Sequence, residues 1–388
     1  MKKDQKIYLD YAATTPVDPR IIKAMEPYLN KKFGNTASLH SFGMEAKEAL
    51  EKSRKIIADT LKAKAQEIIF TSSATESNNL ALKGPFFAEA SKGKPHHGHV
   101  IVSGVEHDCV LESAGWLKRQ GFKVTILPVD QYGMIKPKDV EQAIIKDTIL
   151  VSIMHANNEI GTINPITEIG KICKKHNVLF HTDAAQTFGK LPIDVNRMNI
   201  DLLTASSHKM YGPKGVAMLY VRTGTKIEPI IHGGGHENGL RSSTVNVPAI
   251  VGFARAVELQ NKEENLKIQK LRDKLIKGVL KSIPNATLNG HPKNRLANNV
   301  NIRFKHIEGE AIVMMLDSLE IAVSTGSACS SPKLQASHVL LACGIKQEEA
   351  HGSLRISLGR WTTEKEIDRV LKRLPEVIKK LRQISPFH

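Results

Sequence analysis

The sequence is poor in cysteine, in aromatic residues and in long apolar runs. Its four cysteines form neither a CxxC pair nor a zinc-ligand spacing, which argues against a disulfide framework and a structural zinc site. No stretch approaches the ~20 apolar residues of a membrane span, and the lysine-rich start of the chain leads into no apolar signal core. These absences predict a cytoplasmic protein with free thiols, no resident metal and no membrane contact.

Acidic residues are outnumbered by basic ones. The chain has 55 Lys and Arg against 39 Asp and Glu, a formal net charge of +16. Such an excess could attract anionic partners, RNA included. The excess is spread along the chain, however, aromatic residues make up only 5%, and no nucleic-acid-binding motif occurs. We therefore expect a solvated basic surface and no direct binding of nucleic acid.

A short histidine-rich stretch, PHHGH over 95–99, has the residue types of a metal site. Proline and glycine within it, and its position between two predicted elements, are typical of a turn. We interpret it as a solvated loop.

Short apolar runs alternate with helical patterns from about residue 50 to residue 255. Strands separated by helices imply a mostly parallel sheet that is covered on both faces. Helices are expected up to Leu82 and over 111–120. The predicted strands cover 67–70, 99–102, 124–127, 148–153, 178–181, 201–205 and 216–221.

The pattern changes near Ala254, where one long charged helix is predicted to run toward Ile283. Beyond it come a strand over 299–304, a helix over 309–319, a strand over 354–358 and a terminal helix, which Thr363 and Glu366 would start as a capping box. We predict a large domain over 16–259 and a small α+β domain formed by 1–15 and 260–388.

Chemically useful residues follow the predicted strands. Because ligands of parallel sheets sit beyond the carboxyl ends of the strands, we expect these residues to meet at one edge. The hydroxyl-rich turn 71–75 opens a helix and suits a phosphate, although Ser73 and Glu76 also read as an ordinary capping box. The other residues at this edge are Glu106, His107, Asn157, Asn158, Glu159, Asp183, Gln186, Ser206, His208 and Lys209.

This set of groups matches the needs of pyridoxal 5′-phosphate. The cofactor requires a lysine for a Schiff base, a carboxylate opposite its pyridine nitrogen, and donors for its phosphate and phenolic oxygen. Lys209 and Asp183 supply the first two. Each residue alone has an ordinary structural explanation, but their joint placement after five strands does not.

The motifs of the chain resemble those of the cysteine desulfurases, which are fold-type I pyridoxal-phosphate enzymes of the class-V aminotransferase family, and are most similar to the iron–sulfur-cluster type. The resemblance implies a large domain with a mostly parallel seven-stranded sheet, a small α+β C-terminal domain and a homodimer. It also implies conversion of L-cysteine to L-alanine. The motifs are LDYAATTP (9–16), ATES (74–77), EH (106–107), NNEIG (157–161), SHK (207–209), GGGHE (233–237), GSAC (326–329) and LRISLGR (354–360).

The resemblance also implies roles for individual residues. Lys209 would hold the cofactor and move protons at the substrate carbon, and Asp183 would keep the pyridine nitrogen protonated. Gln186 would bind the phenolic oxygen, and His107 would stack on the ring and assist proton transfer. Phosphate contacts fall on Ala74, Thr75, Ser206 and His208, with Thr244 supplied by the partner subunit. Substrate contacts fall on Asn35, Asn158 and Arg355, and Asn158 is also assigned to the cofactor.

Cys329 is the residue that would distinguish a desulfurase from other enzymes with this cofactor. It lies in a stretch of small and turn-forming residues that predicts a mobile loop over about 324–337. By the resemblance its thiolate takes sulfur from cysteine as a persulfide and passes it to an iron–sulfur scaffold protein, with transient contact to the cluster there, or to tRNA-thiolation proteins. Cys109 and Cys173 are expected to pack, and Cys343 to end a helix.

The chain departs from the family pattern at several positions. Ser73 and Ser243 stand where the family commonly has glycine, which could change the geometry of phosphate-binding turns. Val105 and Asp108 flank His107 atypically. The tail ending at residue 388 is shorter than the tail by which relatives dock their iron–sulfur scaffold protein. The resemblance therefore supports catalysis but does not extend to this docking.

Two other functions remain open from the sequence alone. A selenocysteine lyase would use the same cofactor site, but would retain activity without Cys329 and would ignore cysteine. A basic RNA-binding or assembly protein with an inactive cofactor site would lack the yellow colour of bound cofactor.

Overall fold

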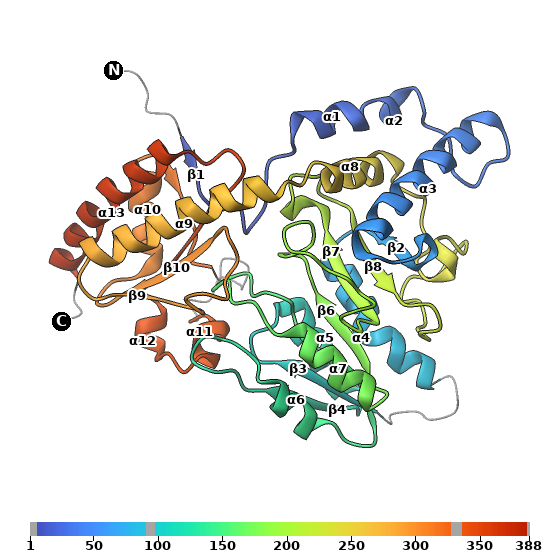
Figure 1. The fold of residues 1–388 in the computed structure, drawn as a ribbon, viewed down its shortest axis with the longest axis horizontal. Coiled ribbons are helices and arrows are strands. Elements are labelled where there is room, and N and C mark those ends of the chain that lie inside the picture. The colour runs from blue at the N-terminus through green and yellow to red at the C-terminus, as the bar shows by residue number, and fades with distance from the viewer. Residues whose placement is uncertain (1–5, 91–97, 327–335, 386–388) are drawn as a thin grey trace.

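The computed structural model describes residues 6–90, 98–326 and 336–385 (Figure 1). Its centre is a seven-stranded sheet with the order β2-β8-β7-β6-β5-β3-β4. Strand β8 runs antiparallel to both neighbours, and the other pairs are parallel, so the predicted fold class is confirmed. The strands are β2 (Ile68–Thr71), β3 (His99–Ser103), β4 (Lys123–Leu127), β5 (Thr148–Ser152), β6 (Leu179–Asp183), β7 (Leu202–Ser206) and β8 (Ala217–Val221).

Alternate residues of the central strands pack on opposite faces of the sheet. Val100 and Val102 join one apolar cluster, whereas Ile101 joins another on the other face, as the two-residue period of a strand requires. Helices close both faces, which explains why the strands read as continuous apolar runs. These helices are α3 (Ser41–Leu61), α4 (Ala74–Ala90), α5 (Asp108–Arg119), α6 (Pro137–Ala143), α7 (Ile166–Lys175) and α8 (Val247–Glu258).

A third apolar cluster lies at the other end of the molecule, where the C-terminal helices flank a small sheet (Figure 1). That sheet has the antiparallel order β12-β10-β9, and β1 pairs with β11 beside it. The strands are β1 (Ile7–Tyr8), β9 (Ala286–Leu288), β10 (Asn299–Phe304), β11 (Ile321–Ala322) and β12 (Ser353–Ser357). The helices of this part are α9 (Lys262–Ser282), α10 (Gly309–Asp317), α11 (His338–Ala342), α12 (Gln347–Ala350) and α13 (Glu364–Ile384).

The single long helix predicted from Ala254 toward Ile283 is wrong. Helix α8 ends at Glu258, and α9 begins at Lys262. Between them Asn261 has extended backbone, and its side chain accepts a hydrogen bond of 2.9 Å from the backbone N–H of Glu263. Because this side chain replaces an intrahelical acceptor at the start of α9, the chain restarts a helix in place of continuing one.

Other local predictions are confirmed. Thr363 and Glu366 form the expected capping box of α13, and Cys343 is the residue that ends α11. Of the stretch 95–99 interpreted as a solvated loop, residues 95–97 lie outside the described residues. His99 is, as the strand predicted over 99–102 has it, a buried residue of β3, with its ring nitrogens 2.9 Å and 2.8 Å from the hydroxyls of Thr148 and Thr125. Pairing of β3 with its neighbours and these two hydroxyl partners explain why His99 is buried and does not belong to a solvated loop.

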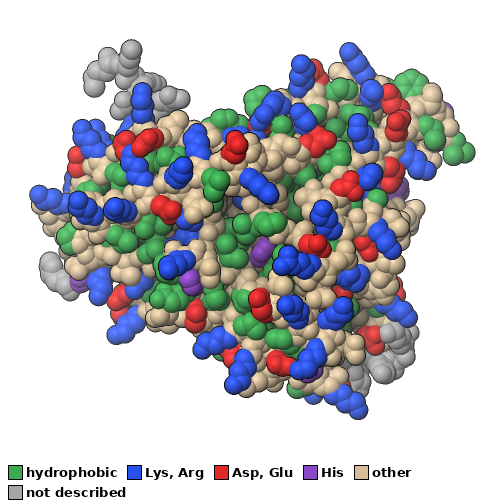
Figure 2. All heavy atoms as spheres, viewed as in Figure 1, with side chains coloured by type: hydrophobic (Ala, Val, Ile, Leu, Met, Phe, Trp, Pro, Cys, Tyr) green, Lys and Arg blue, Asp and Glu red, His purple; other side chains and the backbone are tan. Residues whose placement is uncertain are grey.

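The surface carries its charge without a single-sign patch on the face in Figure 2. Lys and Arg side chains are distributed over the whole face and are interspersed with Asp and Glu, as expected from the sequence. Of the helices that the structure describes, none has both the length and the apolar character needed to cross a membrane. The division into domains at 16–259 stays a prediction.

Candidate active site

The predicted site residues come together at the carboxyl ends of the central strands. Asp183 is the last residue of β6, and Lys209 ends a short 3-10 turn, η2 (Ser207–Lys209), that directly follows β7. His107 follows β3 and caps the start of α5. The parallel order of β3, β5, β6 and β7 therefore delivers these groups to one edge of the sheet.

The amine of Lys209 is held by the N-terminal segment. Its Nζ atom donates hydrogen bonds of 2.6 Å to the carbonyl oxygens of Ala12 and Ala13. Gln186 donates to the same Ala12 oxygen at 3.0 Å. The Ala12 carbonyl thus brings the lysine and the glutamine within reach of each other, although the sequence separates them from it by more than 170 residues.

Asp183 is buried and is held by donors. The amide of Asn78, on α4, donates to Oδ2 at 2.7 Å, and the backbone N–H of Ala185 donates to Oδ1 at 2.8 Å. The Oδ1 atom of Asn78 and the Oε1 atom of Gln186 are buried and without a hydrogen-bond partner among the described residues. Such orphaned acceptors are rare in a folded interior, so a polar ligand is expected to occupy the space that they face.

The imidazole of His107 is oriented by Cys109. The backbone N–H of Cys109 donates to Nδ1 at 3.2 Å, and the thiol sulfur lies 3.2 Å from the same nitrogen. The Nδ1 atom is therefore an acceptor, which places the proton of the neutral ring on Nε2. Burial raises the pKa of the Cys109 thiol to about 12, so this thiol is not a nucleophile, and its expected packing role extends to fixing the histidine.

A cavity of about 240 Å³ next to Lys209 has a lining suited to a phosphate. Burial, with Lys209 and Lys214 nearby, lowers the pKa of His208 to about 4, so its ring is neutral near pH 7. His208 Nδ1 lies 3.1 Å from the hydroxyl of Thr14. Ala74 and Thr75 begin α4 beside this cavity. The lining residues are Thr14, Ser72, Ser73, Ser206, His208, Lys214, Gly215 and Val216.

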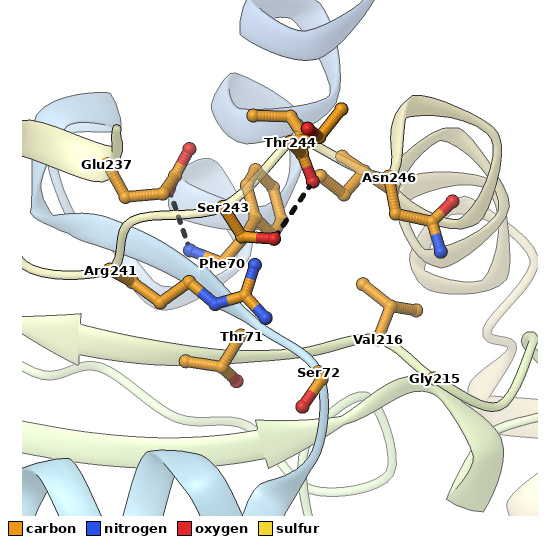
Figure 3. Close-up of a pocket in the computed structure, with 12 residues that line it drawn as sticks. Phe70, Thr71, Ser72, Gly215, Val216, Glu237, Arg241, Ser243, Thr244 and Asn246 are labelled. Carbon is orange, nitrogen blue, oxygen red and sulfur yellow. Dashed lines mark hydrogen bonds between the residues drawn. The ribbon is translucent and has the colours of Figure 1, made fainter. Parts of the chain in front are cut away.

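Thr244 lines a second, adjoining cavity of about 230 Å³ (Figure 3). The two cavities share Ser72, Gly215 and Val216 in their walls. Arg241 also lines the second one, and its Nε donates to Glu76 at 2.9 Å. In its own chain Thr244 thus lines the cavity next to the one suited to a phosphate, and its predicted phosphate contact from a partner subunit stays a prediction.

The two serines that replace family glycines create no backbone strain. Neither Ser73 nor Ser243 has a positive φ, so neither turn needs the conformation that only glycine adopts easily. The hydroxyl of Ser73 accepts a hydrogen bond of 3.1 Å from the backbone N–H of Glu76. The other half of the expected capping box is shifted, because the Glu76 carboxylate accepts from the backbone N–H of Ser72.

Arg355, in β12, points its guanidinium toward the same edge. It is only 4% exposed, and it donates to the Asp10 carboxylate at 2.9 Å and to the Asn158 carbonyl at 3.1 Å. Its Nε atom has no partner among the described residues. A buried guanidinium with a spare N–H can still bind a carboxylate.

Asn35 is the one predicted substrate residue that a single chain does not bring to the site. It lies in the exposed segment between α2 (Pro27–Asn30) and α3, and its side chain accepts from the backbone N–H of Ala37 at 2.9 Å. In Figure 1 this segment, between α2 and α3, is far from β10, the strand that pairs with β12. A substrate contact by Asn35 therefore stays a prediction.

Cys329 lies outside the described residues, but both flanks of its segment are held. Ser324 pairs with Arg355 through two backbone hydrogen bonds, and the hydroxyl of Ser337 donates to Glu159 at 2.8 Å. Burial raises the pKa of Glu159. Residues 324–326 and 336–337 of the predicted mobile loop are thus fixed, and mobility between them stays a prediction.

Three contributors to the site were missed in the sequence. Asn78 lies one helical turn after Ala74, and only that spacing could have suggested it. The carbonyls of Ala12 and Ala13 carry no side-chain signal at all. Within the described part of the chain, no cluster of His, Cys, Asp and Glu could hold a metal ion.

Comparison with known proteins gives the same assignment over nearly the whole chain. The model of the family described as Aminotransferase class-V matches residues 7–370. The cysteine desulfurase IscS of Methanosarcina thermophila is 52% identical over 99% of this chain and 95% of its own, and that of Dictyoglomus turgidum is 51% identical over 99% and 97%.

Solved structures agree with the sequence relatives. A NifS-like protein superimposes with a TM-score of 0.90 at 40% identity, over 97% of this chain and 100% of its own. SspA in complex with cysteine superimposes with a TM-score of 0.83, also at 40% identity, over 92% and 100%.

Proposed function

The chain belongs to the aminotransferase class-V family and is a cysteine desulfurase, and from this premise we propose that it moves the sulfur of L-cysteine onto Cys329 with pyridoxal 5′-phosphate held at Lys209. The observation that carries the proposal is the shared Ala12 carbonyl, which brings the amine of Lys209 together with Gln186 at the end of the strand that carries Asp183. Packing of the sheet does not by itself require a lysine amine at this position.

The residues present fit the cofactor. The cavity lined by Ser206, His208 and Lys214 offers hydroxyl, imidazole and ammonium groups for a phosphate, and Asn78 and Gln186 each keep a buried oxygen without a hydrogen-bond partner among the described residues. When bound, pyridoxal phosphate supplies a protonated ring that accepts the electron pair released at the substrate carbon. The buried Asp183 carboxylate is the group that would keep that ring protonated.

Lys209 is the group that moves the proton. The carbonyls of Ala12 and Ala13 accept two hydrogen bonds from its amine, which fixes the direction in which the amine points. Once its proton is shared with the substrate carbon, these acceptors keep the nitrogen at hydrogen-bond reach of the same spot, as general acid–base catalysis requires.

Arg355 is the group that orients the substrate. Its guanidinium is fixed by Asp10 and by the Asn158 carbonyl, and its Nε is left over for the substrate carboxylate. Because a planar guanidinium binds a carboxylate in one plane, it also sets the orientation of the substrate carbon.

The sulfur step uses the Cys329 thiolate as the nucleophile. The thiolate attacks the substrate sulfur, an S–S bond forms and the C–S bond breaks. The released electron pair goes to the substrate carbon, which takes up a proton, so that one cysteine and one thiol yield one alanine and one persulfide. The persulfide is then passed to an acceptor, for which we propose an iron–sulfur scaffold protein or a tRNA-thiolation protein in the cytoplasm.

The proposal includes a homodimer. In one chain Thr244 lines the neighbouring cavity and not the one lined by His208 and Lys214, and Asn35 lies in an exposed segment, whereas the resemblance assigns both to the site. A second subunit that contributes Thr244 resolves this difference.

The test is to record the visible spectrum of the purified protein, add cysteine and dithiothreitol, and measure sulfide and alanine. The wild type is expected to be yellow and to release both products, Lys209→Ala to lose the colour and the activity, and Cys329→Ala to lose the activity. Cys343→Ala is the matched control. A colourless wild type would refute the cofactor assignment, and alanine release from selenocysteine alone, unaffected by Cys329→Ala, would indicate a lyase.

A further inference from the structure

A cavity of about 330 Å³ lies between the central-sheet part of the chain and the C-terminal part. One wall is the segment 190–192 together with Tyr211, a second is the start of α9, and the third is the segment 295–298 with Leu358. None of the residues assigned above to cofactor or substrate lines it. It is therefore a separate space and not an extension of the active site.

Most of this lining is apolar. The side chains of Leu191, Leu266 and Leu296 face the cavity together with that of Ile268. A space of this size and character suits the body of a small organic molecule, since ligand sites are typically apolar with a few fixed polar groups. The polar groups at its margin therefore decide what kind of molecule fits.

Arg295 supplies one of these polar groups. It is 4% exposed, and one of its nitrogens, Nη2, donates to the carbonyls of Ile160 (2.7 Å) and Asn289. Its Nε and Nη1 atoms are buried and have no partner among the residues that the structure describes. Leaving two donors of a buried cation unsatisfied is costly, so an acceptor in the cavity would offset that cost.

Lys190 supplies a second cation. It is half-buried, and no hydrogen bond or ion pair joins its amine to any described residue. Burial, and then the nearby Lys209, lower its pKa to about 7. The one acid in the lining, Glu264, is already engaged by Arg360 at 2.8 Å. The cavity thus combines the Lys190 amine and two N–H-bearing atoms of Arg295 that lack partners with largely apolar walls, and its one carboxylate is already paired.

We propose that this cavity binds an organic carboxylate with an apolar body, whose carboxylate lies between Lys190 and Arg295. Binding would bridge the two parts of the chain, because the cavity touches Tyr211, two residues after Lys209, and Leu358, three residues after Arg355. The assignment is independent of which sulfur acceptor the enzyme serves.

The test is calorimetric titration of the cofactor-loaded protein with 4-phenylbutyrate, and with 4-phenylbutanol as the uncharged match. A ligand of this size is expected to bind with a Kd of roughly 0.05–1 mM. Lys190→Met is expected to weaken phenylbutyrate binding at least about tenfold and to leave phenylbutanol unchanged. The exposed Lys293→Met is the control. Absence of saturable binding, equal binding of acid and alcohol, or equal binding by Lys190→Met would each refute the proposal.

Proton uptake on binding and a comparison with inorganic phosphate distinguish a site for an organic carboxylate from a site for any small anion. At pH 8 the amine of Lys190 is mostly neutral, so binding of a carboxylate should take up a proton, seen as a heat that depends on the ionisation enthalpy of the buffer. Lys190→Met should abolish the uptake. Inorganic phosphate binding as tightly as phenylbutyrate would refute the organic ligand. The other titratable groups facing this amine are Glu264, Lys262, Arg295, Lys209, His208 and Tyr211.

Discussion

The hydroxyl of Ser337 donates a hydrogen bond of 2.8 Å to the buried carboxylate of Glu159. At the other flank of the segment 327–335, Gly326 packs against the same side chain so closely that a Cβ there would lie 2.6 Å from Glu159 Cγ. One carboxylic side chain therefore sets the positions at which the segment carrying Cys329 leaves and re-enters the described structure.

Gly326→Ala should slow alanine release strongly while the protein stays folded. Gly326 has a φ of +95° and contacts Glu159, so the added methyl group must move either the flank or the glutamate. The backbone strain alone costs about 1–2 kcal/mol. We expect alanine release to fall by at least about tenfold. Gly224→Ala, with a φ of +92° and no atom near the added Cβ, is the control, and an equal loss in that variant would contradict the interpretation.

Arg355→Lys should raise KM for cysteine. Lysine keeps the charge but loses the planar fork and the hydrogen bond to the Asn158 carbonyl. A charge-assisted hydrogen bond contributes about 1.5–3 kcal/mol, so KM should rise by about 10–150-fold. Steady-state kinetics measure this, with Arg303→Lys, at the ion pair with Glu349, as the control. An unchanged KM would remove Arg355 from the substrate site.

Glu106→Gln should change the pH dependence of stability. Burial raises the pKa of Glu106 to about 8, so between about pH 4.5 and 8 the folded state holds a proton that the unfolded state has lost, and this carboxyl's stabilisation falls as pH rises. From pH 5.5 to 7.5 the variant should gain roughly 2–3 kcal/mol relative to wild type. Urea unfolding at both pH values measures the difference; parallel curves would contradict it.

Glu237→Gln should destabilise the fold strongly. Its carboxylate accepts two 2.8 Å hydrogen bonds from Arg54, and both charged side chains are buried. It also accepts from the backbone N–H of Phe70, the contact drawn in Figure 3. Removing one partner of a buried ion pair costs about 3–5 kcal/mol. Glu364→Gln, at the exposed pair with Lys274, should cost no more than about 1 kcal/mol. Urea unfolding of both variants tests the contrast.

The sheet could be predicted from the sequence because its strands are buried on both faces. The run 201–205, for example, carries apolar residues without alternation, and the structure places Leu202 and Leu203 on opposite faces. The break between α8 and α9 could not be predicted, since it depends on one side chain, Asn261, that accepts a local hydrogen bond. The spacing of apolar residues indicates which face of a helix is buried, but it does not indicate where a capping side chain starts a new helix.

The site was partly predictable for a similar reason. Asp183 ends β6 and Lys209 lies three residues after β7, so their placement at one edge follows from the parallel order of these strands. Asn78 contacts Asp183 across 105 residues, and this pairing depends on how α4 packs on the sheet. The resemblance assigned Asn35 to the substrate by its position in the sequence, but in the structure its side chain lies in an exposed segment and accepts from the backbone N–H of Ala37.

The carbonyls that hold the Lys209 amine belong to the peptide backbone at Ala12 and Ala13. No substitution of a single side chain can delete such an acceptor. The amide that donates to Asp183, in contrast, is a side chain, that of Asn78, and a substitution removes it. The orientation of the reactive nitrogen is therefore insulated from most point mutations in its surroundings. Random substitutions should therefore change the binding specificity of the side chains around Lys209 more readily than they change the orientation of its amine.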